Sequence, residues 1–245
     1  MVILVINEKK LKCSNELIKY LLSEIPSIKS IILNINTKNT NVILGEKNIT
    51  LFGTEKIKEQ ICDLIFEISP FSFFQVNPIQ TEVLYNKVLG FANLTGNEIV
   101  LDLYCGIGTI SLLLAKNAKK VYGIEIVEDA ILDARKNAEV NSIKNVEFLS
   151  GDVEKVILDI CNKGIELDVV VLDPPRKGCE TKVLETIVAI NPERIIYVSC
   201  NPSTLARDLN YLVDKGFLVN EVQPVDMFPH TSHVECILRL ERVKK

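Results

Sequence analysis

Cys200 is the residue whose type and position most directly suggest chemistry. It follows a short run typical of a buried strand, Ile195–Val198, and precedes apolar residues at helical spacing that continue until Gly216. Ser203 is a suitable N-cap for that helix. In open α/β sheets ligands bind at the carboxyl ends of strands, and a helix N-terminus favours a thiolate. Cys200 is therefore a candidate nucleophile, with a small buried cysteine of no chemical role as the alternative.

A second group of candidates follows three successive predicted strands. The first strand ends in Gly106-x-Gly108, where positive φ angles and close approach to a ligand are possible. Glu125 ends the next strand at an offset close to the roughly 20 residues expected of an acid that accepts ribose hydroxyls. Asp152 ends the third strand, where it could face an adenine amino group or simply cap a helix. The joint pattern predicts an adenosyl ligand, and Ser111 at the place of a third glycine weakens an NAD site.

Two further acids belong to this sheet edge. Asp102 stands inside the first strand and is predicted to organise the glycine loop by accepting backbone N–H bonds. Asp173 opens the motif DPPRKG after the fourth strand. Its two prolines fix an extended turn and remove two backbone donors, so the carboxylate is held still at the cleft.

Polar residues in two loops have competing interpretations. Gln75, within FSFFQVNP (71–78), is either a bystander in a loop or a group facing a ligand, and the residue pattern alone favours the bystander. His230 and His233 resemble a metal pair, yet only Glu235 and Cys236 accompany them, so loop-ordering hydrogen bonds are favoured and no metal is predicted. On sequence alone Glu235 could be a surface acid at the start of a strand.

These candidates depend on a regular alternation of strands and helices from residue 98 onward. The predicted strands are Ile99–Leu103, Lys120–Ile124, Val146–Leu149, Asp168–Leu172, Arg194–Val198, Phe217–Val222 and His233–Leu240. The predicted helices are Thr109–Ala118, Glu128–Asn141, Val153–Asn162, Thr181–Ile190 and Ser203–Asp214. Short apolar runs without alternation indicate a mostly parallel sheet covered on both faces. The last two strands lack an intervening helix, which predicts an antiparallel strand at one edge. The pattern resembles the Rossmann-like, seven-stranded class I methyltransferase sheet.

The preceding residues predict a smaller unit. Residues 1–68 indicate an α+β subdomain with a strand at Val2–Ile6 and a helix at Asn15–Leu22. Asn41–Leu44 and Ile49–Phe52 flank a turn and predict a hairpin. We expect this subdomain to shape a substrate cleft, residues 69–95 to form a connecting segment with a helix over Thr81–Phe91, and residues 96–245 to form the catalytic domain.

Composition limits the class of protein. Hydrophobic residues make up 47% of the 245 residues and no apolar run has membrane-spanning length, so no membrane partner is expected. Seven scattered cysteines without a C-x-x-C pair favour a reducing cytoplasm and argue against disulfides and zinc or iron–sulfur sites. The net charge of −4 does not suggest nucleic-acid binding. A local basic groove remains an alternative to scattered solvated charges, from Lys119, Lys120, Arg176, Lys177 and Arg207.

Several motifs together span most of the chain: FSFFQVNP (71–78), VLDLYCGIGT (100–109), VVLDPPRKG (170–178), YVSCNPSTLARD (197–208) and DMFPHTSHVE (226–235). With them the sequence resembles the RNA uracil-5 methyltransferase family, whose members make 5-methyluridine in tRNA or ribosomal RNA. TNVILGEKNITLFG (40–53) resembles the segment ahead of the family's catalytic domain. Family members usually begin with a β-barrel RNA-binding domain, and many carry an iron–sulfur segment. The sequence contains neither, so we expect the catalytic part alone or a shortened relative.

The resemblance implies specific roles. Cys200 would be the nucleophile that adds to carbon 6 of uracil, and Glu235 the base that removes the proton from carbon 5. The S-adenosylmethionine contacts that it implies are Gln75, Tyr104, Gly106, Thr109, Glu125, Asp152 and Asp173, with close relatives carrying Asn at positions 109 and 152. The expected partner is structured RNA, with the target base flipped out of its stack and the protein a monomer.

Four alternatives remain at this stage. An RNA 5-methylcytosine methyltransferase tends to carry a cysteine directly after the proline of the strand-four motif, where this chain has Pro175-Arg176, and Cys179 lies farther along. An amine methyltransferase of the N-P-P-Y type needs no cysteine. A non-catalytic RNA-binding relative would retain the sheet without the reaction. An NAD-dependent oxidoreductase lacks the third glycine.

Overall fold

The computed structural model describes residues 1–40 and 42–243, which divide into two compact units. The first unit comprises Met1–Glu59 and Phe66–Ser72, and the second comprises Gln60–Ile65 and the chain from Phe73 onward. In the first unit β1 (Val2–Ile6) pairs parallel with β2 (Ser30–Ile35), and α1 (Ser14–Glu24) connects them. β3 (Lys47–Gly53) completes this sheet.

A hairpin was predicted from two strands, Asn41–Leu44 and Ile49–Phe52. Asn41 lies outside the described residues, and for residues 42–52 the prediction is wrong. Residues 42–44 form no strand, and β3 pairs antiparallel with β2 instead. The buried Asn34 side chain explains this arrangement, since it accepts from the Gly45 N–H at 2.6 Å and donates to the Gly45 carbonyl at 2.7 Å. The amide satisfies backbone groups that a hairpin partner would otherwise take.

A separate two-stranded sheet consists of β4 (Ile57–Ile61) and β5 (Leu64–Ile68). Its turn, Gln60–Ile65, belongs to the second unit. There the Asn141 side chain accepts from the Ile65 N–H at 2.9 Å and donates to the Ile65 carbonyl at 2.7 Å. One amide thus pairs with the strand backbone as a neighbouring strand would.

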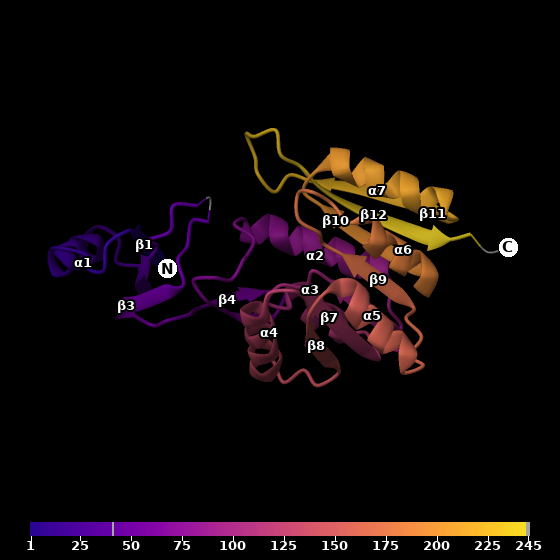
Figure 1. The fold of residues 1–245 in the computed structure, drawn as a ribbon, viewed down its shortest axis with the longest axis horizontal. Helices are drawn as coiled ribbons and strands as arrows, with labels where there is room; N and C mark the ends of the chain where they lie inside the picture. The colour runs from indigo at the N-terminus through magenta and orange to yellow at the C-terminus, as the bar shows by residue number, and fades with distance from the viewer. Residues whose placement is uncertain (41, 244–245) are drawn as a thin grey trace. The chain divides into compact units, whose positions relative to one another are not determined.

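The second unit is built on one seven-stranded sheet with the order β11-β12-β10-β9-β6-β7-β8 (Figure 1). Its strands are β6 (Ile99–Leu103), β7 (Lys120–Glu125), β8 (Val146–Ser150), β9 (Val169–Leu172), β10 (Arg194–Ser199), β11 (Phe217–Val225) and β12 (Glu235–Arg242). β8, β7, β6, β9 and β10 run parallel to one another. Every strand and helix predicted from residue 99 onward is present, with ends that differ by at most three residues. The predicted fold class is confirmed.

Six helices accompany this sheet in two groups. They are α2 (Pro78–Ala92), α3 (Thr109–Ala115), α4 (Glu128–Val140), α5 (Val153–Asn162), α6 (Thr181–Ile190) and α7 (Pro202–Asp214). α5 contacts α6 and α6 contacts α7, whereas α2 contacts α3 and the strands near it. Apolar residues of α5, α6 and α7 form one core with alternate residues of the central strands, such as Leu101, Leu103 and Tyr197. Burial of both sheet faces accounts for the continuous apolar runs in the sequence.

The sequence predicted that the antiparallel strand lies at an edge of the sheet, and this prediction is wrong. β12 lies between β10 and β11 and is antiparallel to both, so β11 is the edge strand. Ile237, Leu238 and Leu240 of β12 are almost fully buried, as is typical of a strand inside a sheet. β11 carries exposed Asn220 and Glu221 and is the strand suited to an edge.

α2 and α7 begin in the same way. Asn77 and Asn201 are the N-caps, each followed by proline at the first helical position. Their side-chain oxygens accept from the N–H of Gln80 and of Ser203. The predicted N-cap Ser203 therefore lies inside α7, because Asn-Pro is the stronger start signal.

Candidate active site

A cavity of about 700 Å³ lies at the carboxyl ends of the parallel strands of the second unit. It brings together eight residues predicted as functional: Gln75, Tyr104, Gly106, Glu125, Asp152, Asp173, Cys200 and Glu235. Phe73, Ile126 and Phe228 add apolar surface that the sequence did not single out. A largely apolar cavity of this size with a few polar groups is typical of a small-molecule site.

The glycine loop forms one wall of the cavity. Gly106 and Gly108 have φ angles of 53° and 83°, as the loop requires of glycines. A Cβ at Gly108 would lie 2.6 Å from the Phe148 ring, whereas a Cβ at Gly106 would meet nothing within 4 Å. Gly108 is therefore needed for packing, and Gly106 leaves the backbone open to the cavity.

Glu125 is held in place by the backbone around it. Its carboxylate accepts from the N–H of Gly106 at 3.2 Å and from the N–H groups of Ile126 and Val127 at 2.8 and 3.0 Å. These bonds fix the side chain at the end of β7 beside the glycine loop. Each carboxylate oxygen can accept two hydrogen bonds, so one acceptor position, on Oε2, remains for a ligand hydroxyl.

Asp102 lies behind the loop and does not line the cavity. It is fully buried, and the Ser111 hydroxyl donates to its Oδ2 at 2.5 Å. Burial raises the pKa of Asp102 to about 7, and hydrogen bonds from the Ser111 hydroxyl and N–H oppose this rise. Ser111, where a dinucleotide motif has glycine, therefore joins β6 to α3.

Asp152 and Thr109 occupy different surroundings. Asp152 lines the cavity and also caps α5, accepting from the Glu154 N–H at 3.1 Å, so both interpretations of this residue apply. Thr109 is the first residue of α3 and accepts from the Tyr85 hydroxyl at 3.2 Å. It is absent from the cavity lining, so the structure does not bring it to the other predicted contacts.

Cys200 and two carboxyl groups share one part of the cavity. Cys200 lies between β10 and the N-cap of α7, and Glu235 is the first residue of β12, 4% exposed. Burial, followed by the charges of Glu235 and Asp102, raises the pKa of Asp173 to about 8. Burial also raises the pKa of Glu235. Asp173 can therefore hold a proton near neutral pH, and the upward shift of the Glu235 pKa makes that carboxylate a better proton acceptor.

The environment of Cys200 differs from the sequence expectation. The position ahead of a helix predicts a favoured thiolate, but burial and the charges of Glu235 and Asp173 raise the pKa of the thiol. The Arg176 guanidinium opposes this, lowering the pKa of both Cys200 and Glu235. Arg176 lines the cavity in an exposed position. The sequence suggested it only as part of a basic groove and not as a neighbour of Cys200.

Two motif-bearing loops are connected at the cavity. The Asn77 side-chain amide donates to the Met227 carbonyl at 3.2 Å, which joins the end of FSFFQVNP to DMFPHTSHVE. Gln75 from the first loop and Phe228 and Glu235 from the second line the cavity. The position of Gln75 favours the ligand-facing interpretation over the bystander.

The predicted basic groove is only partly formed. Arg176 and Lys177 line the cavity. Lys120 begins β7, at the opposite end of the strand from Glu125, and pairs with Glu147 at 3.1 Å. Arg207 pairs with Asp208. Parallel strands carry their amino ends away from the ligand-binding edge, so Lys119 and Lys120 do not join this surface.

The remaining cysteines and histidines show no cluster. All seven cysteines are free thiols. Cys179 is buried, its pKa is raised to about 11 mainly by burial, and it does not line the cavity. His230 and His233 are exposed, and His233 packs edge-on against Phe228. Among residues 1–40 and 42–243, no group of three or more His, Cys, Asp or Glu side chains is placed to hold a metal ion.

No helix within those same residues is long and apolar enough to cross a membrane.

Known proteins show which family shares these features. The family described as tRNA (Uracil-5-)-methyltransferase matches residues 16–243. An uncharacterized RNA methyltransferase of Caldanaerobacter subterraneus subsp. tengcongensis is 57% identical over 243 residues, covering 99% of this chain and 54% of that protein. The chain thus spans about half the length of the curated relatives it matches.

Solved structures give the same result at the level of the fold. The Pyrococcus abyssi tRNA (uracil-54, C5)-methyltransferase, in complex with S-adenosyl-L-homocysteine, has a TM-score of 0.79 and 33% identity, covering 97% of this chain and 55% of that one. The Methanocaldococcus jannaschii tRNA m1G37 methyltransferase has a TM-score of 0.66 at 17% identity and shares the fold alone. From the match over residues 16–243 and the identity to its relatives, the chain belongs to the tRNA (uracil-5-)-methyltransferase family.

Proposed function

We propose that this chain transfers a methyl group from S-adenosylmethionine to carbon 5 of a specific uridine in structured RNA, rRNA or tRNA, through a covalent adduct between Cys200 and carbon 6. The observation that carries the proposal is one cavity lined by a thiol, a buried carboxyl group and a glycine loop with its acid: Cys200, Glu235, Gly106 and Glu125. The structural relative bound to S-adenosyl-L-homocysteine supports the choice of cofactor.

The residues of the glycine wall fit S-adenosylmethionine. Gly106 leaves open space where a Cβ would stand, and the Glu125 carboxylate is fixed beside it by three backbone N–H groups. Gln75, Tyr104, Asp152 and Asp173 surround the same volume. When bound, the cofactor supplies an electrophilic methyl group on a sulfonium. Glu125 would hold the ribose hydroxyls, and the loop would orient the donor by close backbone contact.

Cys200 and Glu235 perform the covalent chemistry on the uridine. The Cys200 thiol loses its proton to solvent and the thiolate adds to carbon 6. The carbon 5–carbon 6 π electrons then move toward the carbon 4 oxygen, which makes carbon 5 a nucleophile. After carbon 5 has gained the methyl group, Glu235 takes the proton from carbon 5. The electron pair of that C–H bond re-forms the double bond and the sulfur leaves carbon 6 as thiolate. Cys179, buried with a pKa of about 11, is unsuited to the alternative 5-methylcytosine chemistry.

The RNA partner follows from the family and from the chemistry of the cavity. A uracil ring reaches a cavity of this kind only when it has left its stack. Exposed Arg176 and Lys177 line the cavity and would attract the phosphate backbone. We expect the chain to act as a monomer in the cytoplasm, with neither metal nor membrane taking part.

RNA carrying 5-fluorouridine tests this proposal. Because fluorine cannot be removed as a cation by Glu235, incubation with cofactor should give a covalent protein–RNA complex that survives denaturant. The complex is detected as a band of reduced mobility on a denaturing gel. Cys200→Ala should give none, and RNA containing 5-fluorocytidine serves as the control for the base.

Absence of a complex with both tRNA and ribosomal RNA transcripts that carry 5-fluorouridine would overturn the proposal. An equal yield from Cys200→Ala would overturn the role of the thiol. A complex with 5-fluorocytidine RNA alone would replace uridine by cytidine as the substrate.

A further inference from the structure

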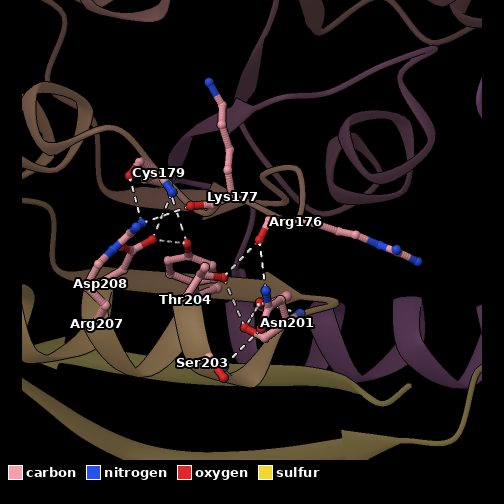
Figure 2. Close-up of polar contacts among 10 residues, drawn as sticks. Arg176, Lys177, Cys179, Asn201, Ser203, Thr204, Arg207 and Asp208 are labelled. Atoms are coloured by element: carbon pink, nitrogen blue, oxygen red, sulfur yellow. Dashed lines mark hydrogen bonds and ion pairs between the residues drawn. The ribbon is translucent and has the colours of Figure 1, made fainter. Parts of the chain in front are cut away.

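The backbone of the loop Arg176–Cys179 is held by side chains of α7 (Figure 2). The Asn201 amide donates to the Arg176 carbonyl at 3.1 Å, and the Thr204 hydroxyl lies 3.2 Å from the same oxygen. Asn201 also caps α7, so one side chain both starts the helix and holds the loop. Figure 2 shows the Arg176 and Lys177 side chains extending away from these contacts, so only the loop backbone is used.

Arg207 and Asp208 hold the rest of the loop. One Arg207 Nη2 donates to the carbonyls of Lys177 at 3.0 Å and Cys179 at 3.2 Å. The Asp208 Oδ2 accepts from the Cys179 N–H at 2.8 Å. We call Asn201, Thr204, Arg207 and Asp208 the α7 clamp.

Asp208 is the buried centre of the clamp, with 1% of its surface exposed. Its carboxylate accepts from the Tyr197 hydroxyl at 2.6 Å and from the Arg207 Nε at 2.8 Å. Tyr197 lies in β10 and is fully buried. The carboxylate therefore joins three elements: the strand that ends at the nucleophile, the helix after it and the loop across from them. A buried carboxylate with donors of this number is fully satisfied and rigid.

Gly178 shows how closely the loop approaches the clamp. It has a φ of 75°, and a Cβ there would lie 2.6 Å from both the Arg207 Nη2 and the Asp208 Oδ2. Any larger residue would push the guanidinium and carboxylate away from the loop. The glycine is therefore part of the contact.

The held loop carries cavity residues, and the clamping helix lies next to one in the sequence. Arg176 of the loop lines the cavity, as do Pro174 and Pro175, which join the loop to Asp173. α7 begins two residues after Cys200, with its N-cap Asn201 between them. The charges of Glu235 and Asp173 raise the pKa of the Cys200 thiol and that of Arg176 lowers it, so two of these three groups lie at or beside the loop. A shift of the loop relative to α7 would change both distances at once.

We propose that the α7 clamp is a positioning device for methyl transfer. This proposal rests on the proposed function. The clamp fixes the Arg176–Cys179 backbone against α7 and so sets where Asp173 and Arg176 lie relative to the Cys200 sulfur. Its members touch neither substrate nor cofactor in this role. They are positioning residues for the reaction.

Asp208→Asn changes the clamp, and Gly178→Ala changes the loop that the clamp holds. Asp208→Asn keeps the shape but removes the charge that pairs with Arg207, and Gly178→Ala inserts a methyl group between loop and clamp. Each should lower the rate constant for adduct formation on 5-fluorouridine RNA by about 10- to 100-fold, because a small displacement costs rate strongly. The RNA concentration for half-maximal rate should stay near the wild-type value.

A second readout needs no RNA. The rate of Cys200 alkylation is measured against pH in the free protein, with the modified cysteine identified by mass spectrometry. In both variants the midpoint of this profile should move from the wild-type value, because the distances to Asp173 and Arg176 change. A purely structural role would lower the melting temperature without moving the midpoint.

Asp214→Asn is the matched control, since it removes the same charge from an exposed position in the last turn of the same helix. It should behave as wild type in both assays. Arg207→Lys, at a mostly exposed side chain, replaces any variant that fails to fold. It keeps the charge beside Asp208 but cannot donate to two carbonyls with a planar fork, and an intermediate loss of rate is expected.

An unchanged adduct rate per folded molecule, or an unchanged alkylation midpoint, in Asp208→Asn and Gly178→Ala or their replacement would overturn the proposal. If the wild-type protein forms no adduct at all, the proposed function fails on its own. The alkylation midpoint then still decides whether the clamp positions the thiol.

Discussion

The Cys200 thiol and its neighbouring carboxyl groups compete for negative charge. Burial raises the pKa values of Cys200, Asp173 and Glu235, and the charges of neighbouring carboxylates raise those of Cys200 and Asp173 further, so an ionised carboxylate disfavours ionisation of the thiol. Arg176 offsets this for Cys200 and Glu235. In the free protein at neutral pH the thiol form of Cys200 is therefore favoured. The sulfur must lose its proton before it adds to carbon 6.

Glu235→Gln tests this competition. The charge of Glu235 raises the pKa of Cys200, so its loss should lower that pKa and increase the thiolate fraction at neutral pH. Alkylation of Cys200 at pH 7.5 should become severalfold faster, because a larger fraction of the sulfur is thiolate. The measurement is the rate of iodoacetamide labelling, followed by mass spectrometry, with Cys200→Ala to locate the signal.

Glu235→Gln should speed the alkylation of Cys200 but slow turnover of RNA. Without its base it should accumulate methylated adduct on ordinary RNA. Slower alkylation than in wild type would contradict the electrostatic account, and product release at the wild-type rate would remove Glu235 from its role as base.

At this scale the sequence predicted residue types better than their states. Cys200 and Glu125 could be found because strand ends and spacing are visible in the pattern, and both line the cavity. The pKa of Cys200 could not, because it depends on charges brought in from two distant segments. Asp208 and Tyr197 were missed for the same reason, since their hydrogen bond joins a strand interior to a helix.

Among the elements, the glycine loop offers a paired test of local geometry. Gly108 caps α3 with a φ of 83°, and an added Cβ would lie 2.6 Å from the Phe148 ring. Gly108→Ala should lower the free energy of unfolding by about 2–4 kcal/mol, from backbone strain and overpacking together. Urea unfolding followed by circular dichroism measures the loss.

Gly106→Ala is its control for stability. It has a similar positive φ of 53° but open space around the Cβ, so only backbone strain of about 1 kcal/mol is expected. Equal losses in the two variants would show that contact with Phe148 is not the cause.

Sequence patterns located the elements of the second unit more reliably than their partners. The strands from Ile99 onward were found because each is a short apolar run between helix signals. The position of β12 between β10 and β11 depends on which strand is apolar on both faces. The failed hairpin around Gly45 depends on one buried amide, Asn34, whose pairing has no local sequence signal.

Over the whole molecule, buried carboxyl groups make stability depend on pH. Asp102 has a folded-state pKa of about 7 against an ordinary value of 3.8. Between these values the folded protein keeps a proton that the unfolded chain has lost. Stability is therefore highest at acidic pH and falls as pH rises toward 7, by up to about 1.4 kcal/mol per pH unit for one such group.

Asp102→Asn should remove the part of this dependence that comes from Asp102, and the part from Asp173, whose pKa burial and nearby charges raise to about 8, should remain. The variant should gain stability over wild type at pH 8.5 and differ little at pH 5, as measured by urea unfolding at both values. Asp214→Asn, which removes an exposed carboxylate, should show no such difference between the two pH values. A wild-type protein equally stable at pH 5 and pH 8.5 would contradict the sign.

Asn77 and Asn201 share a chemical property that follows from the proline after each. Asparagine ages by losing ammonia through a five-membered imide, which the peptide nitrogen of the next residue closes. Proline has no N–H to surrender in that step, so this route is blocked at both positions. The amide nitrogens that donate to Met227 and Arg176 are thus protected from slow conversion to carboxylates. A further negative charge next to Cys200 would raise the pKa of the thiol again. Loss of ammonia through the imide cannot create such a charge at these two positions.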